Sequence, residues 1–256
     1  MLVGRANQES VLQTFYDMHP YPSYPFAARP RFQEGIWANP RFHLHRAGLK
    51  AGSRPLKVLI GGAGAILPAV IGSWLCPNDV LIVNDLSARS LRRAKFAMRW
   101  RHLFQNRWFV EPLQATLQRF PHNFLDHADL FGVLHHMSHP EDVLVPLFDC
   151  LKPGATVRVM VYHHHGRELV RRVRDRVAPF SPFEPRDIMK ARARVRALAD
   201  DKDWQSFFAA IGPAWKVSDA DFVDRFMHPL ERYFSIVQWL GIFREVGFHL
   251  TAVMDR

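Results

Sequence analysis

The feature that most constrains the fold is an apolar run that meets a glycine turn, followed by a second apolar run that ends in a carboxylate. The first is Lys57-Val58-Leu59-Ile60-Gly61-Gly62-Ala63-Gly64, and the second is Val80-Leu81-Ile82-Val83-Asn84-Asp85. A strand, glycine turn, helix and second strand let backbone approach a ligand closely and place a carboxylate near ribose hydroxyls. The pattern therefore predicts a site for an adenosine-containing cofactor.

Strand and helix patterns alternate as far as residue 162. Further strands are predicted at 108–110, 126–131 and 155–162, and helices at 65–75, 88–101 and 141–151. The last of these helices is closed by Pro153 and Gly154, which cannot continue it. Alternation implies parallel pairing with right-handed crossovers, so we predict an α/β fold with a doubly wound, mainly parallel sheet.

The rest of the chain is predicted to add an arm before this core and helices after it. Residues 1–50 are predicted to form an aromatic and proline-rich arm. We expect it to be extended over 11–49, because X-Pro pairs exclude regular helix locally. Its second predicted role is a lid over the ligand. Residues 51–162 are the cofactor-binding core, and 163–230 are a helical insertion after the fifth strand that caps the acceptor pocket. Residues 231–256 supply a helix ending at Gly247 and a last strand at 248–253.

The composition says more about the partners and the cellular environment of the protein than about any reaction that it catalyses. The formal net charge is +10, which favours encounters with anionic partners, nucleic acid included. Cys76 and Cys150 are not expected to form a disulfide framework, which fits a reducing cytoplasm. We find no pattern of a signal peptide and no run apolar enough to span a bilayer, so a soluble protein without a membrane partner is expected.

Several motifs taken together resemble one enzyme family. The turn Gly62-x-Gly64-x-x-Leu67 lacks the third glycine of dinucleotide dehydrogenases, which argues against NAD. The chain also contains Asp85, Gly132-Val133-Leu134-His135-His136 and Leu151-Lys152-Pro153-Gly154. Taken together with the turn, these motifs resemble those of the class I S-adenosylmethionine-dependent methyltransferases. The segments 16–25 and 226–234 are similar to those of a bacterial subgroup with a Tyr/Pro-rich amino-terminal arm.

The resemblance implies a Rossmann-like fold, S-adenosyl-L-methionine as cofactor, and direct methyl transfer to an acceptor. The glycines of the turn would approach the cofactor's ribose and methionine part, Asp85 would bind the ribose, and Leu86 would lie against the adenine. The end of the fourth strand would border the sulfonium, and His136 is the candidate catalytic group. The cofactor-binding residues so implied are Gly62, Gly64, Asp85, Leu86, Phe131, Gly132 and Val133.

Three positions depart from the family pattern. Ile60 stands where an acidic residue is usual, Ile66 replaces the last glycine of the turn, and only Glu111, in a shifted register, could supply the third-strand acid. These departures keep open a competing class, a binding or regulatory module that retains the fold without turnover.

The acceptor is left open by the sequence. A small molecule is favoured over nucleic acid, because the arginine-rich stretch 167–196 carries no recognised RNA-binding module. His135, His136 and His139 could meet His163-His164-His165 at neighbouring strand ends, but the spacing matches no familiar ligand set, so no metal site is predicted. A last strand left as an open edge would favour a homodimer.

Overall fold

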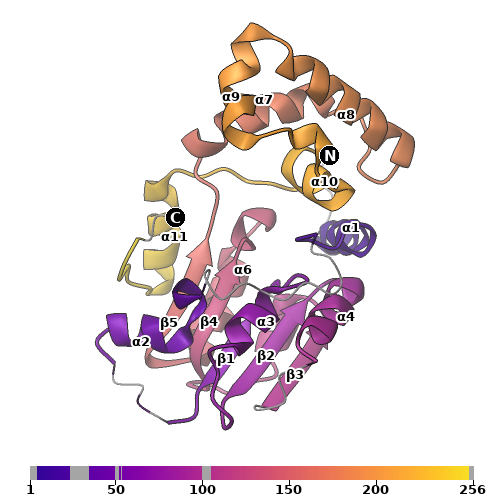
Figure 1. The fold of residues 1–256 in the computed structure, drawn as a ribbon. Helices are drawn as coiled ribbons and strands as arrows, with labels where there is room; N and C mark the ends of the chain where they lie inside the picture. Colours follow the sequence, from indigo (N-terminus) through magenta and orange to yellow (C-terminus); the bar gives the residue numbers. More distant parts are fainter. Residues whose placement is uncertain (1–4, 24–34, 50–51, 53, 100–104, 254–256) are drawn as a thin grey trace.

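A five-stranded parallel sheet forms the centre of the fold in the computed structural model, which describes residues 5–23, 35–49, 52, 54–99 and 105–253 (Figure 1). The strand order is β3-β2-β1-β4-β5, and every neighbouring pair is parallel. The strands are β1 (Lys57–Ile60), β2 (Val80–Asp85), β3 (Gln105–Val110), β4 (Leu125–Phe131) and β5 (Leu151–Met160). The predicted α/β fold with a mainly parallel sheet is confirmed.

Helices cover both faces of the sheet, which is why its central strands are continuous apolar runs. One face buries side chains of β1 and β2 against α2 (Pro40–Arg46), α3 (Leu67–Gly72) and α4 (Ala88–Ala97). The other face packs on α5 (Leu113–Leu117), α6 (Glu141–Cys150) and α11 (Ile236–Val246). Successive residues Leu59 and Ile60 point to opposite faces, as strand geometry requires.

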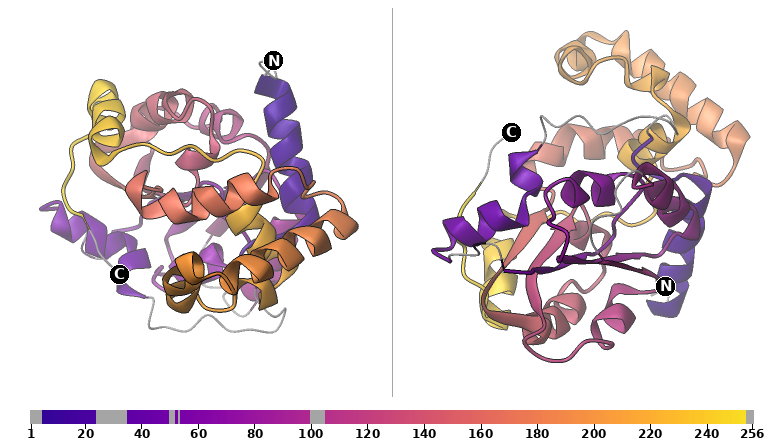
Figure 2. Two further views of the ribbon diagram at one scale, coloured as in Figure 1. Left: turned by 90° about the horizontal axis from the view of Figure 1, so that it is seen from above. Right: turned by 60° about the horizontal axis from the view of Figure 1, so that its bottom comes forward.

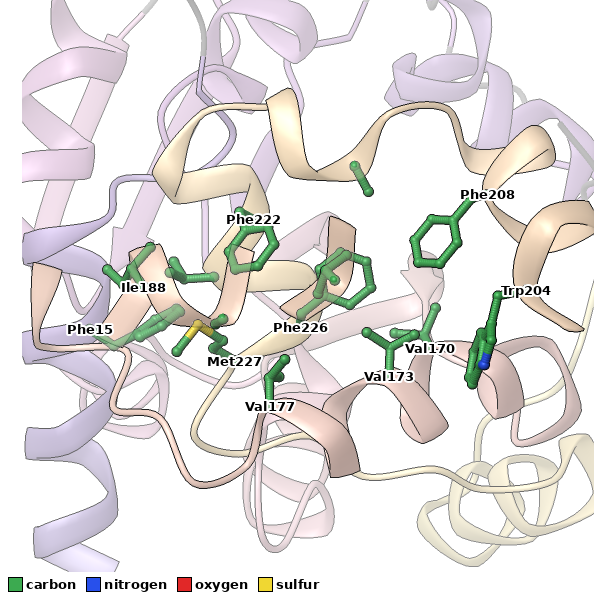
Figure 3. Close-up of a cluster of buried hydrophobic side chains, with 14 residues drawn as sticks. Phe15, Val170, Val173, Val177, Ile188, Trp204, Phe208, Phe222, Phe226 and Met227 are labelled. Atoms are coloured by element: carbon green, nitrogen blue, oxygen red, sulfur yellow. The ribbon is translucent and has the colours of Figure 1, made fainter. Parts of the chain in front are cut away.

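Four further helices stand over the carboxyl ends of the strands and form what we call the cap (Figures 1 and 2). They are α7 (Glu168–Val177), α8 (Pro185–Ala199), α9 (Gln205–Ile211) and α10 (Asp219–Phe226). The cap has its own hydrophobic core, in which Val173 and Phe222 are completely buried (Figure 3). The helices predicted after the fifth strand are therefore present.

The amino-terminal helix α1 (Arg5–Met18) joins the cap to the sheet layer. Its Phe15 is fully buried in the core of the cap (Figure 3). On the other side, the Asp17 carboxylate accepts a hydrogen bond of 2.7 Å from the Ser87 hydroxyl at the start of α4. The expectation of an extended arm over 11–49 is thus wrong for residues 11–18, because the helix ends before Pro20 and the X-Pro restriction does not reach it. It is also wrong for the short helices Ile36–Ala38 and Pro40–Arg46, since a proline such as Pro40 is accepted at the first position of a helix.

The predicted last strand at 248–253 is also wrong. The helix before it ends at Gly247 as predicted, with φ of 109°, and the Phe248 ring turns back to pack edge-on against Phe148 and Phe243. Residues 248–253 form no strand, and the side chains of Leu250 and Val253 are 59% and 75% exposed. The open edge that led us to expect a homodimer does not exist in this form.

Other differences concern the ends of elements. The helix predicted at 65–75 spans only Leu67–Gly72, and the one predicted at 88–101 ends at Ala97, with 100–101 outside the described residues. The helix predicted at 141–151 ends at Cys150, and Pro153 and Gly154, which were expected to close it, lie within β5, which begins at Leu151. The register of β5 with β4 shifts between Leu125 and His127. Arm residues 24–34 and the last residues, 254–256, likewise lie outside the described ranges.

Two expectations drawn from composition concern disulfides and membrane spans. Cys76 and Cys150 are free thiols, as expected. In the part of the chain that the structure describes, none of the helices combines the length and the apolar character needed to cross a membrane.

Candidate active site

A cavity of about 390 Å³ lies where the strands end, between the sheet and the cap. The strand order reverses between β1 and β4, and the crevice at such a switch point is where open α/β sheets bind ligands. Every residue predicted for the site lines this cavity: Gly62, Gly64, Asp85, Leu86, Phe131, Gly132, Val133 and His136.

The glycine turn after β1 accepts no side chain at two positions. Gly62 and Gly64 have φ of 60° and 57°, a region that disfavours residues with a Cβ. A Cβ on Gly62 would lie 2.5 Å from a methyl of Val133, and one on Gly64 would lie 2.7 Å from the Tyr21 carbonyl oxygen. The turn therefore presents bare backbone to the cavity.

Asp85 is a buried carboxylate at the end of β2. It accepts hydrogen bonds of 2.8 Å from the backbone N–H groups of Gly64 and Ser87. Burial raises its pKa to about 6, although those two hydrogen bonds act in the opposite direction. Asp85 is thus fixed in place, charged at neutral pH, and able to accept further hydrogen bonds from a ligand in the cavity.

The three departures from the family pattern have distinct structural roles. Ile60 is fully buried in the sheet core, and Ile66 lines the cavity at the start of α3. Glu111 is paired with Arg119 at 2.7 Å and also accepts a hydrogen bond from Thr116. Glu111 does not line the cavity, whereas the next residues, Pro112 and Leu113, do.

The end of β4 forms the wall opposite the glycine turn. Asp129, fully buried, pairs at 2.6 Å with Arg158 of β5, which is only 8% exposed. The same guanidinium lies 4.7 Å from the centre of the Phe131 ring, which it holds against the cavity. Gly132 follows with φ of 79°, and this conformation turns the chain away from the strand.

His136, in the loop after β4, is buried and held in place by a hydrogen bond to the backbone. Its Nδ1 lies 2.8 Å from the Leu230 carbonyl oxygen, so Nδ1–H donates and Nε2 is left as an acceptor. Burial lowers its pKa to about 4, which keeps the ring neutral. His163, His164 and His165 do not line the cavity, so the two histidine loops do not meet there.

Sequence reasoning did not identify a second group of polar side chains on the cap side. Tyr16 of α1, Tyr21 and Asp224 of α10 line the cavity together with Tyr162, and Asp224 is only 6% exposed. Burial and the neighbouring Glu231 raise the pKa of Asp224 to about 7. The available signal was a carboxylate within the apolar run Phe222-Val223-Asp224-Arg225-Phe226.

The donor atoms of His136, Asp224 and His228 lie within 4.8 Å of one another. The two rings stack 3.8 Å apart at an angle of 28°, so their in-plane lone pairs do not converge on one ion. The Leu230 N–H donates to Nδ1 of His228, which leaves Nε2–H to donate to the Tyr16 hydroxyl at 2.9 Å. This cluster is arranged as a hydrogen-bonding wall.

Comparison with known proteins gives distant relatives. No family model matches the chain. Over 161 residues it is 26% identical to the ubiquinone/menaquinone biosynthesis C-methyltransferase UbiE of Ectopseudomonas mendocina, a match that covers 62% of each chain. Over 123 residues it is 28% identical to the tRNA 5-carboxymethoxyuridine methyltransferase of Escherichia coli, covering 48% of this chain and 46% of that one. The matches thus span less than two thirds of these relatives.

A solved structure shares the fold over most of the chain. PKMT2 from Rickettsia typhi in complex with AdoHcy superposes with a TM-score of 0.63 at 15% identity, covering 88% of this chain and 44% of that one. Because the match covers 88% of the chain, the similarity of fold extends beyond the sheet and its flanking helices.

Proposed function

We propose that this chain, which belongs to the class I S-adenosylmethionine-dependent methyltransferases, binds S-adenosyl-L-methionine in the cavity and transfers its methyl group to a small-molecule acceptor. The observation that carries the proposal is the joint arrangement of two side-chain-free turn residues, Gly62 and Gly64, with the fixed carboxylate of Asp85. A Cβ at Gly62 would clash with Val133 and one at Gly64 with the Tyr21 carbonyl, so both positions keep bare backbone at the edge of the cavity, which suits a ligand that contacts backbone.

One end of the cavity is proposed to bind the cofactor and the other end the acceptor. Asp85 accepts hydrogen bonds from the ribose hydroxyls, Leu86 borders the adenine, and the end of β4 encloses the methionyl chain. When bound, the cofactor supplies an electrophilic methyl group on sulfur. The protein's own contribution is to align the acceptor and exclude water, which accounts for much of the rate enhancement in a displacement of this kind.

The acceptor is proposed to enter on the cap side. His136 is the catalytic candidate from the sequence, and its Nε2 is placed to accept a hydrogen bond that orients the acceptor. Segment 163–230 shapes this end, and segment 1–50 acts as a lid through Tyr16 and Tyr21. Since both cysteines are free thiols, we place the reaction in the cytoplasm.

A nucleic-acid acceptor is the second candidate, favoured by the similarity to a tRNA methyltransferase. We prefer a small molecule because several arginines in and beside the cap pair with carboxylates of the protein itself. Arg167 and Arg174 pair with Glu231, and Arg192 pairs with Asp219. An RNA acceptor predicts affinity for RNA that falls steeply with salt, which filter binding at two salt concentrations would measure.

Replacing Asp85 with alanine is expected to weaken S-adenosylhomocysteine binding by about 100-fold, since it removes hydrogen bonds to a charged group worth roughly 1.5–3 kcal/mol each. Calorimetric titration of wild type and variant measures this loss. Asp149→Ala, on the exposed side of α6, is the matched control and should bind like wild type. A folded wild-type protein that binds neither S-adenosylmethionine nor S-adenosylhomocysteine would favour the non-catalytic module instead.

Cofactor binding should also depend on pH through Asp85. Its pKa in the free protein is about 6, and hydroxyl donors favour the charged form, so the ligand-bound pKa is lower. The dissociation constant of S-adenosylhomocysteine should be flat above pH 7 and rise about tenfold per pH unit below pH 6. Calorimetry between pH 5 and 8 tests this, and a constant that falls on acidification would contradict the assigned role.

A further inference from the structure

A buried carboxylate without a partner lies at the acceptor end of the cavity. Asp224 borders both the main cavity and a smaller one beside it, and it is 6% exposed. Among the described residues, no hydrogen bond or ion pair reaches it. Burying a charged group without compensation is costly, so such a group is normally matched by a ligand or a neighbour.

The nearest cations are committed elsewhere. Arg167 and Arg174 both bind the Glu231 carboxylate, at 2.8 and 2.9 Å, and Arg174 also donates to the His228 carbonyl oxygen. Arg225 borders the smaller cavity but makes no ion pair with Asp224 in the described part of the chain. The Asp224 carboxylate is therefore left without a direct cationic partner among the described residues.

The walls around this position are aromatic. Tyr16, Tyr21 and Tyr162 line the main cavity, and burial raises the pKa of each phenol, that of Tyr21 to about 12. The phenols are therefore neutral at physiological pH. Neutral aromatic rings attract cations through their negative faces. Arg167 already lies 3.8 Å from the centre of the Tyr162 ring, so Tyr21, which borders both cavities together with Asp224, is the ring available to an organic ammonium ion.

We propose that the methyl acceptor is an amine, which enters as an ammonium ion, is held by Asp224 beside the Tyr21 ring, and gives its proton to the Asp224 carboxylate before transfer. This inference rests on the proposed function and assigns its substrate class. Asp224 is then a catalytic residue, because it contacts the reacting nitrogen directly.

The atoms and charges balance in two steps. The ammonium N–H bond breaks and its proton moves to an oxygen of Asp224, which leaves a neutral amine with a free electron pair. The nitrogen then forms a bond to the methyl carbon while the carbon–sulfur bond breaks, and that bond's electrons remain on sulfur. The products are a methylated ammonium ion and S-adenosylhomocysteine, and Asp224 releases its proton to solvent.

The pKa of the acceptor group favours an amine over a hydroxyl as the substrate of Asp224. Asp224, with a pKa of about 7, lies roughly three units below an alkylammonium ion of about 10, a gap that general-base catalysis can bridge. An aliphatic hydroxyl, near the value of about 16 for water, is far out of reach. His136, with a pKa of about 4, is a weaker base than Asp224, and an anionic acceptor would be repelled by the carboxylate.

The test uses three probes with one skeleton: 2-phenylethylamine, 2-phenylethanol and 3-phenylpropanoate. Each is titrated calorimetrically into the full chain saturated with S-adenosylhomocysteine at pH 7.5. We expect the amine to bind at least tenfold more tightly than the alcohol, and the carboxylate to bind most weakly. Asp224→Asn should lose at least tenfold in amine affinity and the preference for amine over alcohol.

Asp219→Asn is the matched control, since Asp219 lies on the same helix as Asp224, borders neither cavity, and its exposed carboxylate already pairs with Arg192. It should retain the preference. The S-adenosylhomocysteine affinity of both variants should stay within twofold of wild type. If wild type binds S-adenosylhomocysteine but takes up no amine, or binds amine and alcohol equally, the inference is overturned. If wild type binds no S-adenosylhomocysteine, the proposed function itself fails.

Discussion

Replacing Glu231 with alanine is expected to lower the free energy of unfolding by about 3–5 kcal/mol, the cost typical of removing one partner from a buried ion pair. Its side chain is completely buried and holds Arg167 on one carboxylate oxygen and Arg174 on the other. Without Glu231, two guanidiniums only 14% and 17% exposed would face each other with no counter-charge between them. The start of the cap would then separate from the segment that joins it to α11.

Urea denaturation followed by circular dichroism measures the effect as a shift in midpoint at unchanged slope. The matched control is Glu168→Ala, because Glu168 also pairs with an arginine of α7 but does so in solvent, where the pair contributes little. Its midpoint should stay close to wild type. Equal shifts for the two variants would show that burial of the Glu231 pair adds nothing.

Replacing Gly64 with alanine should weaken S-adenosylhomocysteine binding by more than 100-fold, about 2.7 kcal/mol. Two effects add at this position. The φ of 57° costs a residue with a Cβ roughly 1–2 kcal/mol, and the new methyl would lie 2.7 Å from the Tyr21 carbonyl oxygen. That oxygen also accepts the Ala65 N–H, so the turn and the amino-terminal segment must separate to make room.

Gly48→Ala controls for backbone strain alone. Gly48 has φ of 80°, but a Cβ there meets no atom within 4 Å, and the residue does not line the cavity. It should lose some stability and keep its full affinity for S-adenosylhomocysteine. Calorimetry on both variants, with melting curves to show that they fold, separates the two effects. Near-normal affinity in Gly64→Ala would mean that the turn does not contact the cofactor.

The cofactor end of the site could be predicted because its determinants are local. Gly62 and Gly64 are required by the conformation of one turn, and Asp85 ends the next strand, so a short stretch of sequence carries the whole arrangement. The cap end could not be predicted in the same way. Asp224 and Tyr21 meet only through the packing of α10 over the sheet, which no local pattern encodes.

The predictions of an extended arm and of a strand at 248–253 were wrong for the same reason. Each applied a sequence pattern to residues beyond those that it governs. The prolines from Pro20 onward govern only the residues beside them, and α1 ends before they begin. The apolar residues after Gly247 read as a strand, but Phe248 finds its partners in Phe148 and Phe243, and the residues beyond it have no neighbour to pair with. In both cases tertiary packing decided the outcome.

The cap and the sheet bury their side chains in separate clusters, with Phe15 of α1 reaching into that of the cap. Substitutions in one cluster therefore leave the packing of the other intact, and their effects on stability are close to additive. For the history of such a protein, this means that the two halves can evolve under separate selection. Under the proposed function, changes in the cap can alter the acceptor end of the cavity while the packing of the sheet layer is inherited unchanged.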